Sequence, residues 1–282
     1  MIRIKIITIL LPLVGFVFAD CRRAEAPPLG DQQALYEAAK TGDLETFAAL
    51  ILKGTNPSAQ NVQGFEAGDT ALIISSRAGN GRIFDFLLSN IKVIPDLEKQ
   101  KALVAASSKN RWHIVEKLLK QRVNPNTYDL LHKPIMAAAR GGHLETVEML
   151  YQKGARIDFR DMTAGAFGRT ALMFAAEGRH APVISYLITK GANVNLRTLP
   201  EDNPRVPEGG ATALMLTFQE STDEYEIDKH RDAVQTLLNA GADLALKDNM
   251  GLSALDWAHK SKRSCCNDIL SRNNSKDRPE HK

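Results

Sequence analysis

The chain has 282 residues, of which 44% are hydrophobic and only 6% aromatic. This composition is typical of a soluble globular protein whose helices pack closely through small side chains. With 36 basic and 33 acidic residues the formal net charge is +3, which is too balanced to predict nucleic-acid binding, because binding to phosphates needs clustered positive charge.

The N-terminal segment has the pattern of a secretory signal. Arg3 and Lys5 supply positive charge, and residues 6–18 then run almost entirely apolar, ending in a Val-Phe-Ala sequence before Asp20. An N-terminal core helix or a membrane anchor is the alternative, but a span needs about 20 apolar residues and this run is shorter. We therefore expect residues 1–19 to be a signal peptide of the bacterial type, which predicts a periplasmic or secreted protein.

Cys21 offers a second mode of export. Bacterial lipoprotein signals end at a cysteine that becomes lipidated, and Cys21 follows the expected cleavage region directly. Asp20 departs from that pattern, in which a small neutral residue precedes the cysteine. Both a released protein and an envelope lipoprotein tethered through Cys21 therefore remain as alternatives. Residues 20–30, which include Pro27 and Pro28, are expected to form a linker.

A motif that begins a helix recurs seven times after the linker. Its clearest copy is Thr170-Ala-Leu-Met-Phe-Ala-Ala, and the second residue of each copy falls at 34, 71, 102, 134, 171, 213 and 254. Each copy is followed by a turn and a second apolar helix, as in the stripe formed by Leu144, Val147, Leu150 and Tyr151. A glycine that can adopt the left-handed cap then ends the second helix, as at Gly54, Gly154, Gly191 and Gly241.

The order of helix, tight turn, helix, glycine and extended finger, with a period of about 33 residues, resembles the ankyrin repeat. The resemblance covers residues 31–272 and implies an all-α solenoid of about seven helix-turn-helix units with extended finger loops. One departure is consistent: the histidine of the family's Thr-Pro-Leu-His motif is absent, and Met173 and Met215, for example, take its place. We expect apolar contact to replace the hydrogen bonds of that histidine. Residues 273–282 are polar and are expected to be a disordered tail.

Signatures of enzymes are missing from the sequence. It contains no Gly-rich phosphate loop, no Gly-x-Ser-x-Gly elbow and no His-Glu-x-x-His helix. His143 and His180 fall at equivalent turns, where the family often has histidine, so we expect them to be structural. Cys265 and Cys266 are expected to be buried, since adjacent helical residues point about 100° apart and no third metal ligand is evident. The sequence therefore predicts no catalytic site, no metal and no cofactor.

The resemblance to ankyrin repeats implies that partners bind at one surface of the solenoid. Ankyrin proteins usually bind partner proteins through the inner helices and the finger tips, which line one concave face. The exposed position of the inner helix holds, in chain order, Lys40, Arg77, Ser108, Arg140, Glu177, Gln219 and Lys260. Lys40, Arg77 and Arg140 are candidate contacts for an acidic partner surface, although ordinary solvated charge explains them equally well.

Longer repeats add candidate contacts in loops. Ala171 and Ala213 are equivalent residues 42 positions apart, whereas Ala71 and Ala102 are 31 positions apart. Insertions in repeat proteins map to loops on one face, and long loops on a regular scaffold are often functional, with neutral insertion as the alternative. The candidate contacts in these loops are Phe167, Leu199, Arg205, Val206 and Tyr225.

The sequence thus predicts a non-enzymatic scaffold in the periplasm or cell envelope, which binds a partner protein on its concave face and long fingers. Two alternatives belong to other classes: an immunity or inhibitor protein that neutralises a toxic enzyme in the periplasm, and a secreted effector that acts on host proteins. No nucleic-acid partner is expected, and contact with a membrane is expected only if Cys21 is lipidated. A repeat scaffold does not identify its partner, because function lies in the surface grafted onto it.

Overall fold

The computed structural model describes residues 29–62, 68–126, 133–162, 167–199, 209–219, 227–261 and 266–276. Within these residues it contains fourteen α-helices, and the only extended pairings are two isolated bridges. The predicted all-α class and the predicted seven helix pairs are therefore confirmed. The chain divides into two compact units, Met1–Val123 and Asn124–Lys282.

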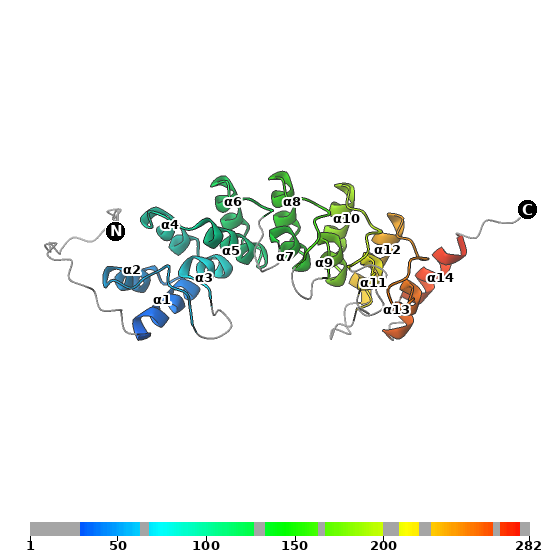
Figure 1. Ribbon diagram of the computed structural model, residues 1–282, viewed down its shortest axis with the longest axis horizontal. Coiled ribbons are helices and arrows are strands. Elements are labelled where there is room, and N and C mark those ends of the chain that lie inside the picture. The colour runs from blue at the N-terminus through cyan, green and yellow to red at the C-terminus, as the bar shows by residue number, and fades with distance from the viewer. Residues whose placement is uncertain are drawn as a thin grey trace, which may run out of the picture. The chain divides into compact units, whose positions relative to one another are not determined.

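Each unit is built from consecutive helix pairs (Figure 1). In the first unit the pairs are α1 (Leu29–Thr41) with α2 (Leu44–Leu52), α3 (Ala71–Ala78) with α4 (Gly81–Asn90), and α5 (Asp96–Ser107) with α6 (Trp112–Lys120). In the second unit they are α7 (Pro134–Arg140) with α8 (Leu144–Gln152), α9 (Ala171–Glu177) with α10 (Ala181–Thr189), α11 (Ala213–Leu216) with α12 (Ile227–Asn239), and α13 (Ala254–Lys260) with α14 (Asn267–Lys276).

The first helices of the pairs form the core of each unit. In the first unit α3 packs between α1 and α5, and in the second unit α9 packs between α7 and α11. These helices are rich in alanine and buried on nearly every side: all six residues from Ala71 to Ser76 are buried, as are the six from Ala171 to Ala176. A helix that is buried all round needs small side chains to let its neighbours approach, which explains the repeated Ala-Leu-x-x-Ala-Ala pattern.

Backbone geometry at the helix ends follows the sequence prediction. Gly54, Gly154, Gly191 and Gly241 have φ angles of 98°, 90°, 91° and 82°. These angles lie in the left-handed region, which glycine enters without a steric penalty. The residue before a first helix has an extended backbone, as Thr170 does with φ −97° and ψ 170°. The helix-turn-helix boundaries are therefore encoded locally.

The replacement of the motif histidine is only partly apolar, which corrects the expectation from sequence. The Sδ atoms of Met173 and Met215 accept the backbone N–H of Thr170 and Thr212 at 3.4 and 3.5 Å. Asp256 does the same for Ser253 with its carboxylate, at 2.8 Å. Sulfur is a weak acceptor, but a weak acceptor still relieves a helix donor that would otherwise be buried without a partner.

Glu98 is a buried carboxyl group that joins two neighbouring repeats of the first unit. It lies in the first turn of α5, is 8% exposed, and accepts a hydrogen bond from the Thr70 hydroxyl at 2.5 Å. Burial raises the pKa of Glu98, and the bond from Thr70 offsets part of that rise. The charged carboxylate is therefore less favourable in the folded protein than in the unfolded chain.

Glu98→Gln is accordingly expected to stabilise the first unit at neutral pH. Glutamine keeps an acceptor for Thr70 but removes the charge. The pKa of Glu98 is higher in the folded protein than in the unfolded chain, where it is about 4.3. Ionisation of Glu98 therefore begins to destabilise the wild type as the pH rises above about 4.3, and the loss of stability is complete above the folded pKa. Urea unfolding at pH 7 should favour the variant, and the advantage should vanish as the pH falls below about 4. A variant less stable than the wild type at pH 7 would contradict this account.

Helix α11 is shorter than its sequence motif predicts. It ends at Leu216 after four residues, and the hydroxyl of Thr217 donates to the carbonyl oxygen of Leu214 at 2.8 Å. The guanidinium of Arg179, which is 4% exposed, donates from Nε to the Thr217 oxygen and from Nη2 to the Gln219 oxygen, both at 3.2 Å. Arg179 therefore caps the helix of the following repeat, a role that its place in the turn before α10 does not suggest.

The ends of the repeat array differ slightly from the sequence prediction. Helix α1 already begins at Leu29, within the predicted linker, and α14 continues to Lys276, within the predicted tail. Burial of Leu270 and the bond from Asn273 Nδ2 to the Ile269 oxygen, at 2.8 Å, hold the helix there. The predicted signal peptide, residues 1–19, lies outside the described residues. None of the helices that the structure describes is both long and apolar enough to cross a membrane.

Candidate partner-binding surface

Three of the fingers are closed by the same pair of backbone hydrogen bonds around one buried polar residue. In the first unit Asn61, 4% exposed, donates its N–H to the Asp69 oxygen at 2.8 Å and accepts from Gly68 at 2.6 Å. In the second unit Asp161, 3% exposed, is joined to Arg169 and Gly168 in the same way, at 2.9 and 2.8 Å. Thr198, 0% exposed, repeats the pattern with Ala211 and Gly210, at 2.8 and 3.0 Å.

The last finger is tighter and is held by a carboxylate. Asp248, 5% exposed, accepts from the backbone N–H groups of Met250 and Leu252 at 2.9 and 2.8 Å. Its second carboxylate oxygen accepts from Trp257 Nε1 at 2.8 Å, which ties the finger to α13. Buried, fully bonded anchors of this kind fix the position of the residues beside them.

Next to these anchors, apolar side chains point into solvent. Val62 follows Asn61 in the first unit and is 73% exposed. In the second unit Met162 follows Asp161 and is 73% exposed, and Met250 is 57% exposed. A single exposed apolar residue needs no explanation, but Val62 and Met162 fill the same position in two fingers. Exposed apolar side chains that gather beside buried anchors are a feature of binding surfaces. Sequence reasoning missed these residues, although an alignment of the fingers on Asn61 and Asp161 would have revealed Val62 and Met162.

Two of the predicted finger contacts, Phe167 and Leu199, lie in successive fingers that contact each other. The N–H of Leu199 donates to the Phe167 oxygen at 2.5 Å, and a Cβ built on Gly168 would lie 2.7 Å from the Leu199 side chain. Both side chains are half-buried. They therefore brace two successive fingers of the second unit, and each keeps a partly exposed face. Arg205, Val206 and Tyr225 lie outside the described residues.

The predicted basic contacts Arg77 and Arg140 carry ion pairs. In the first unit Arg77 lies 2.6 Å from Asp69. In the second unit Arg140 lies 3.5 Å from Glu177, and its guanidinium stands 4.9 Å from the centre of the Phe174 ring. These pairs reduce the positive charge that either arginine offers to a partner.

Glu177 also holds a second arginine. Arg169, whose side chain is only 10% exposed, lies 3.0 Å from the same Glu177 oxygen and 3.3 Å from Gln219 Oε1. Arg140, Glu177 and Gln219 occupy the same exposed position in three successive repeats, so Arg169 completes a polar chain across them. Lys40, in the first unit, is exposed, and its carbonyl oxygen accepts from Asn80 Nδ2 at 2.8 Å.

Glu177→Gln is expected to cost about 1–2 kcal/mol of stability in the second unit, because it leaves the largely buried Arg169 guanidinium without a carboxylate. Arg140→Ala removes the exposed end of the same cluster, at 46% side-chain exposure, and should cost no more than about 0.5–1 kcal/mol. Urea unfolding of the two variants measures the difference. Equal losses would mean that Arg169 gains nothing from Glu177.

His143 and His180, together with Cys266, have structural surroundings. His180 Nε2 lies 2.9 Å from the Arg140 oxygen, and the His143 ring packs against Gly141, whose added Cβ would collide with it. Cys266 is fully buried, while Cys21 and Cys265 lie outside the described residues. Across the part of the chain that the structure describes, no three His, Cys, Asp or Glu side chains gather closely enough to hold a metal ion.

Comparison with known proteins identifies the family to which these repeats are similar. A family model described as Ankyrin repeats (3 copies) matches residues 35–129, 103–198 and 135–248. The "Ankyrin repeat and KH domain-containing protein mask-1" of Caenorhabditis elegans is 31% identical over 135 residues, which are 48% of this chain and 5% of that protein. "Cyclin-dependent kinase inhibitor 2A" of Monodelphis domestica is 29% identical over 131 residues, which are 46% of this chain and 56% of that protein.

The match therefore spans a small fraction of the first relative and about half of the second. Ankyrin repeats commonly mediate protein–protein interaction, in agreement with exposed apolar side chains on firmly anchored fingers. Because the matched stretches together run over most of the sequence, the chain belongs to the ankyrin-repeat family.

Proposed function

We propose that this protein is a non-enzymatic scaffold that binds a partner protein through its finger tips and the exposed side of its first helices. The observation that carries the proposal is the exposure of Met162 and Met250, at 73% and 57%, on fingers whose anchors Asp161 and Asp248 are buried. An apolar side chain held beside a buried anchor loses little conformational entropy on binding, which favours affinity. The half-exposed pair Phe167 and Leu199 extends the apolar surface of the second unit.

The place of action in this proposal is the periplasm or cell envelope. Its support is the basic start and apolar run of the first 19 residues, with Cys21 as the site of lipidation in the tethered form. Export would restrict the partners to envelope proteins and to proteins that enter from outside.

Site-specific photo-crosslinking tests the binding surface. A photo-crosslinking amino acid is placed at Met162 or Met250, and at Gln152, an exposed residue of α8, as the control. The proposal expects one protein to be crosslinked from both finger positions and not from Gln152. Crosslinking that is equal at all three positions would contradict it.

Export is tested separately by expressing the full chain in a Gram-negative host and measuring the mass of the mature N-terminus in each cell fraction. A chain that starts at Asp20 in the periplasm supports a released protein. A chain that starts at Cys21 with added acyl mass supports the tethered form. An intact Met1 in the cytosol overturns the proposed location and leaves the binding surface to be judged by the crosslinks.

An inhibitor of an enzyme is the second candidate function. It is favoured by the printed name of one relative, "Cyclin-dependent kinase inhibitor 2A", and by the suitability of a rigid repeat surface for covering an active site. In the periplasmic form of this candidate the target is a toxic enzyme against which the protein confers immunity. A crosslinked partner that is an enzyme, binds more tightly than about nanomolar and loses activity in the complex would favour the inhibitor over a general scaffold.

A further inference from the structure

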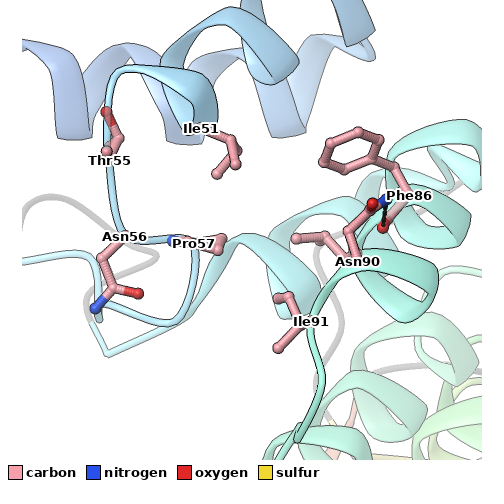
Figure 2. Close-up of a pocket in the computed structure, with 9 residues that line it drawn as sticks. Ile51, Thr55, Asn56, Pro57, Phe86, Asn90 and Ile91 are labelled. Atoms are coloured by element: carbon pink, nitrogen blue, oxygen red, sulfur yellow. Dashed lines mark hydrogen bonds between the residues drawn. The ribbon is translucent and has the colours of Figure 1, made fainter. Parts of the chain in front are cut away.

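The first unit contains a small pocket away from the finger tips. It lies between the end of α2, the loop that follows and the end of α4, and has a volume of about 220 Å³. The residues that line it include Ile51, Thr55, Pro57, Phe86, Asn90 and Ile91. Figure 2 shows Ile51 from α2 and Phe86 from α4 on opposite sides of one opening, with Pro57 and Ile91 below them.

The walls of this pocket are fixed by the core. The Phe86 ring packs edge-on against Phe47, with ring centres 6.0 Å apart, and Phe47 is 0% exposed. The Asn90 amide is held by a bond from Nδ2 to the Phe86 oxygen at 2.7 Å (Figure 2). A pocket with walls fixed in this way is already formed before an occupant arrives, which lowers the cost of binding.

Size and lining limit the occupant. Ordinary small-molecule pockets measure about 300–1,000 Å³, so a volume of about 220 Å³ holds one large side chain rather than a whole cofactor. Anchoring residues of protein interfaces fill pockets of this kind, and tyrosine and tryptophan are enriched among them.

Two polar atoms favour an aromatic side chain that carries a hydrogen-bond donor. Thr55 and Asn90 line the pocket and are 2% and 8% exposed. Thr55 Oγ1 and Asn90 Oδ1 meet no hydrogen-bond partner among the described residues. A buried acceptor without a partner is costly. The Asn90 amide is already held by Phe86, whereas the Thr55 side chain can turn its hydroxyl toward the pocket, so a phenol or indole donor that then reaches Thr55 Oγ1 gains affinity.

Charge at the rim selects what surrounds the anchor. Lys53 adjoins the lining residue Gly54, Lys92 adjoins Ile91, and both lysines are exposed. Neither side chain meets an ion-pair or hydrogen-bond partner among the described residues, and none of the lining residues is acidic. Asp85, which precedes the lining residue Phe86, is paired with Lys117 at 2.7 Å. The unpaired charge next to the lining residues is therefore positive and complements carboxylates on either side of an anchoring residue.

We propose that this pocket docks a tyrosine or tryptophan side chain of a partner protein, presented by a segment with acidic residues beside it. The pocket lies in the first unit and requires none of the finger residues Met162 and Met250. Its occupation can therefore fail while the finger surface still binds, and the reverse holds too.

Methyl NMR of the full chain tests the pocket, with the methyl signals of Ile51, Leu87 and Ile91 as reporters. Three short capped peptides serve as probes: one with a central tyrosine between glutamates, one with alanine in its place, and one with tyrosine between lysines. The acidic tyrosine peptide is expected to shift the reporter signals and to bind at least about tenfold more tightly than the alanine peptide. Equal shifts with the alanine peptide would overturn the anchoring role.

Charge-reversal variants test the rim without touching the pocket. Lys53→Glu combined with Lys92→Glu is expected to weaken the acidic tyrosine peptide by roughly tenfold and to favour the basic one. Lys153→Glu is the matched control, because Lys153 has the same place before a helix-ending glycine in the second unit. An unchanged affinity of the double variant would overturn the acidic flank.

Two other occupants would also overturn the proposal. If the reporter signals of the free protein change on dilution, the pocket holds a second copy of the chain. If they change in the full-chain variant Ile9→Asp, the pocket holds the chain's own apolar N-terminal stretch. The proposal expects neither change.

Discussion

Arg179→Ala is expected to lower the free energy of unfolding of the second unit by about 3 kcal/mol. The substitution removes two hydrogen bonds from a buried guanidinium, to the carbonyl oxygens of Thr217 and Gln219, and each bond to a charged group contributes about 1.5–3 kcal/mol. The substitution also leaves the carbonyl groups at the end of α11 without the donors that Arg179 supplies. The loss matters more than in a longer helix, because α11 has only four residues. Arg179 has a φ of 57°, and alanine retains the strain of this left-handed backbone.

Trp257 reports this loss in the second unit when Trp112, the other of the two tryptophans, is replaced by phenylalanine. Urea unfolding followed by Trp257 fluorescence then measures the stability of Arg179→Ala. The control, Arg122→Ala, lies in the first unit and is followed in the same way through Trp112, with Trp257 replaced by phenylalanine. Arg122 has a similar φ of 61° but is exposed, so its substitution should cost less than about 0.5 kcal/mol. Arg179→Lys should fall between them, since an ammonium cannot reproduce the planar fork of a guanidinium. Equal losses for Arg179→Ala and Arg122→Ala would remove the capping role.

The helix pairs could be predicted from the sequence because their signals are local. An extended threonine such as Thr170, an alanine-rich helix and a left-handed glycine such as Gly191 each act within a few residues. The length of α11 could not be predicted, because the group that closes it belongs to the preceding repeat. For the same reason Glu98 was not recognised as the partner of Thr70, which lies in the repeat before it.

The candidate surface was predicted less well, because charge at an exposed position does not say what it is paired with. The sequence places Arg140 and Glu177 at equivalent positions in successive repeats, so their contact could have been anticipated. The contribution of Arg169 could not, because its side chain reaches Glu177 and Gln219 from the base of a finger. The pocket beside α2 and α4 was also missed, since its walls come from helix ends that the motif does not describe.

Met162→Asp and Met250→Asp are expected to weaken binding to the crosslinked partner by at least about tenfold each. Burying a methionine side chain contributes about 1.5–3 kcal/mol, which corresponds to roughly a tenfold to hundredfold change in affinity, and a carboxylate in its place adds a cost of desolvation. Because both side chains are exposed in the free protein, at 73% and 57%, the thermal unfolding of the variants should match that of the wild type.

Calorimetric titration of the purified partner measures these affinities, and Gln152→Asp on α8 controls for the added charge. Asp161 and Asp248 hold the fingers with buried bonds, so Met162→Leu and Met250→Leu, which keep the apolar contact, should retain most of the affinity. A loss confined to the aspartate variants identifies apolar burial at the finger tips as the source of binding. Unchanged affinity in both aspartate variants would place the partner elsewhere on the protein. If the Lys53→Glu, Lys92→Glu variant also bound the partner as well as the wild type, the polar chain of Arg140, Glu177 and Gln219 would be the surface to test next.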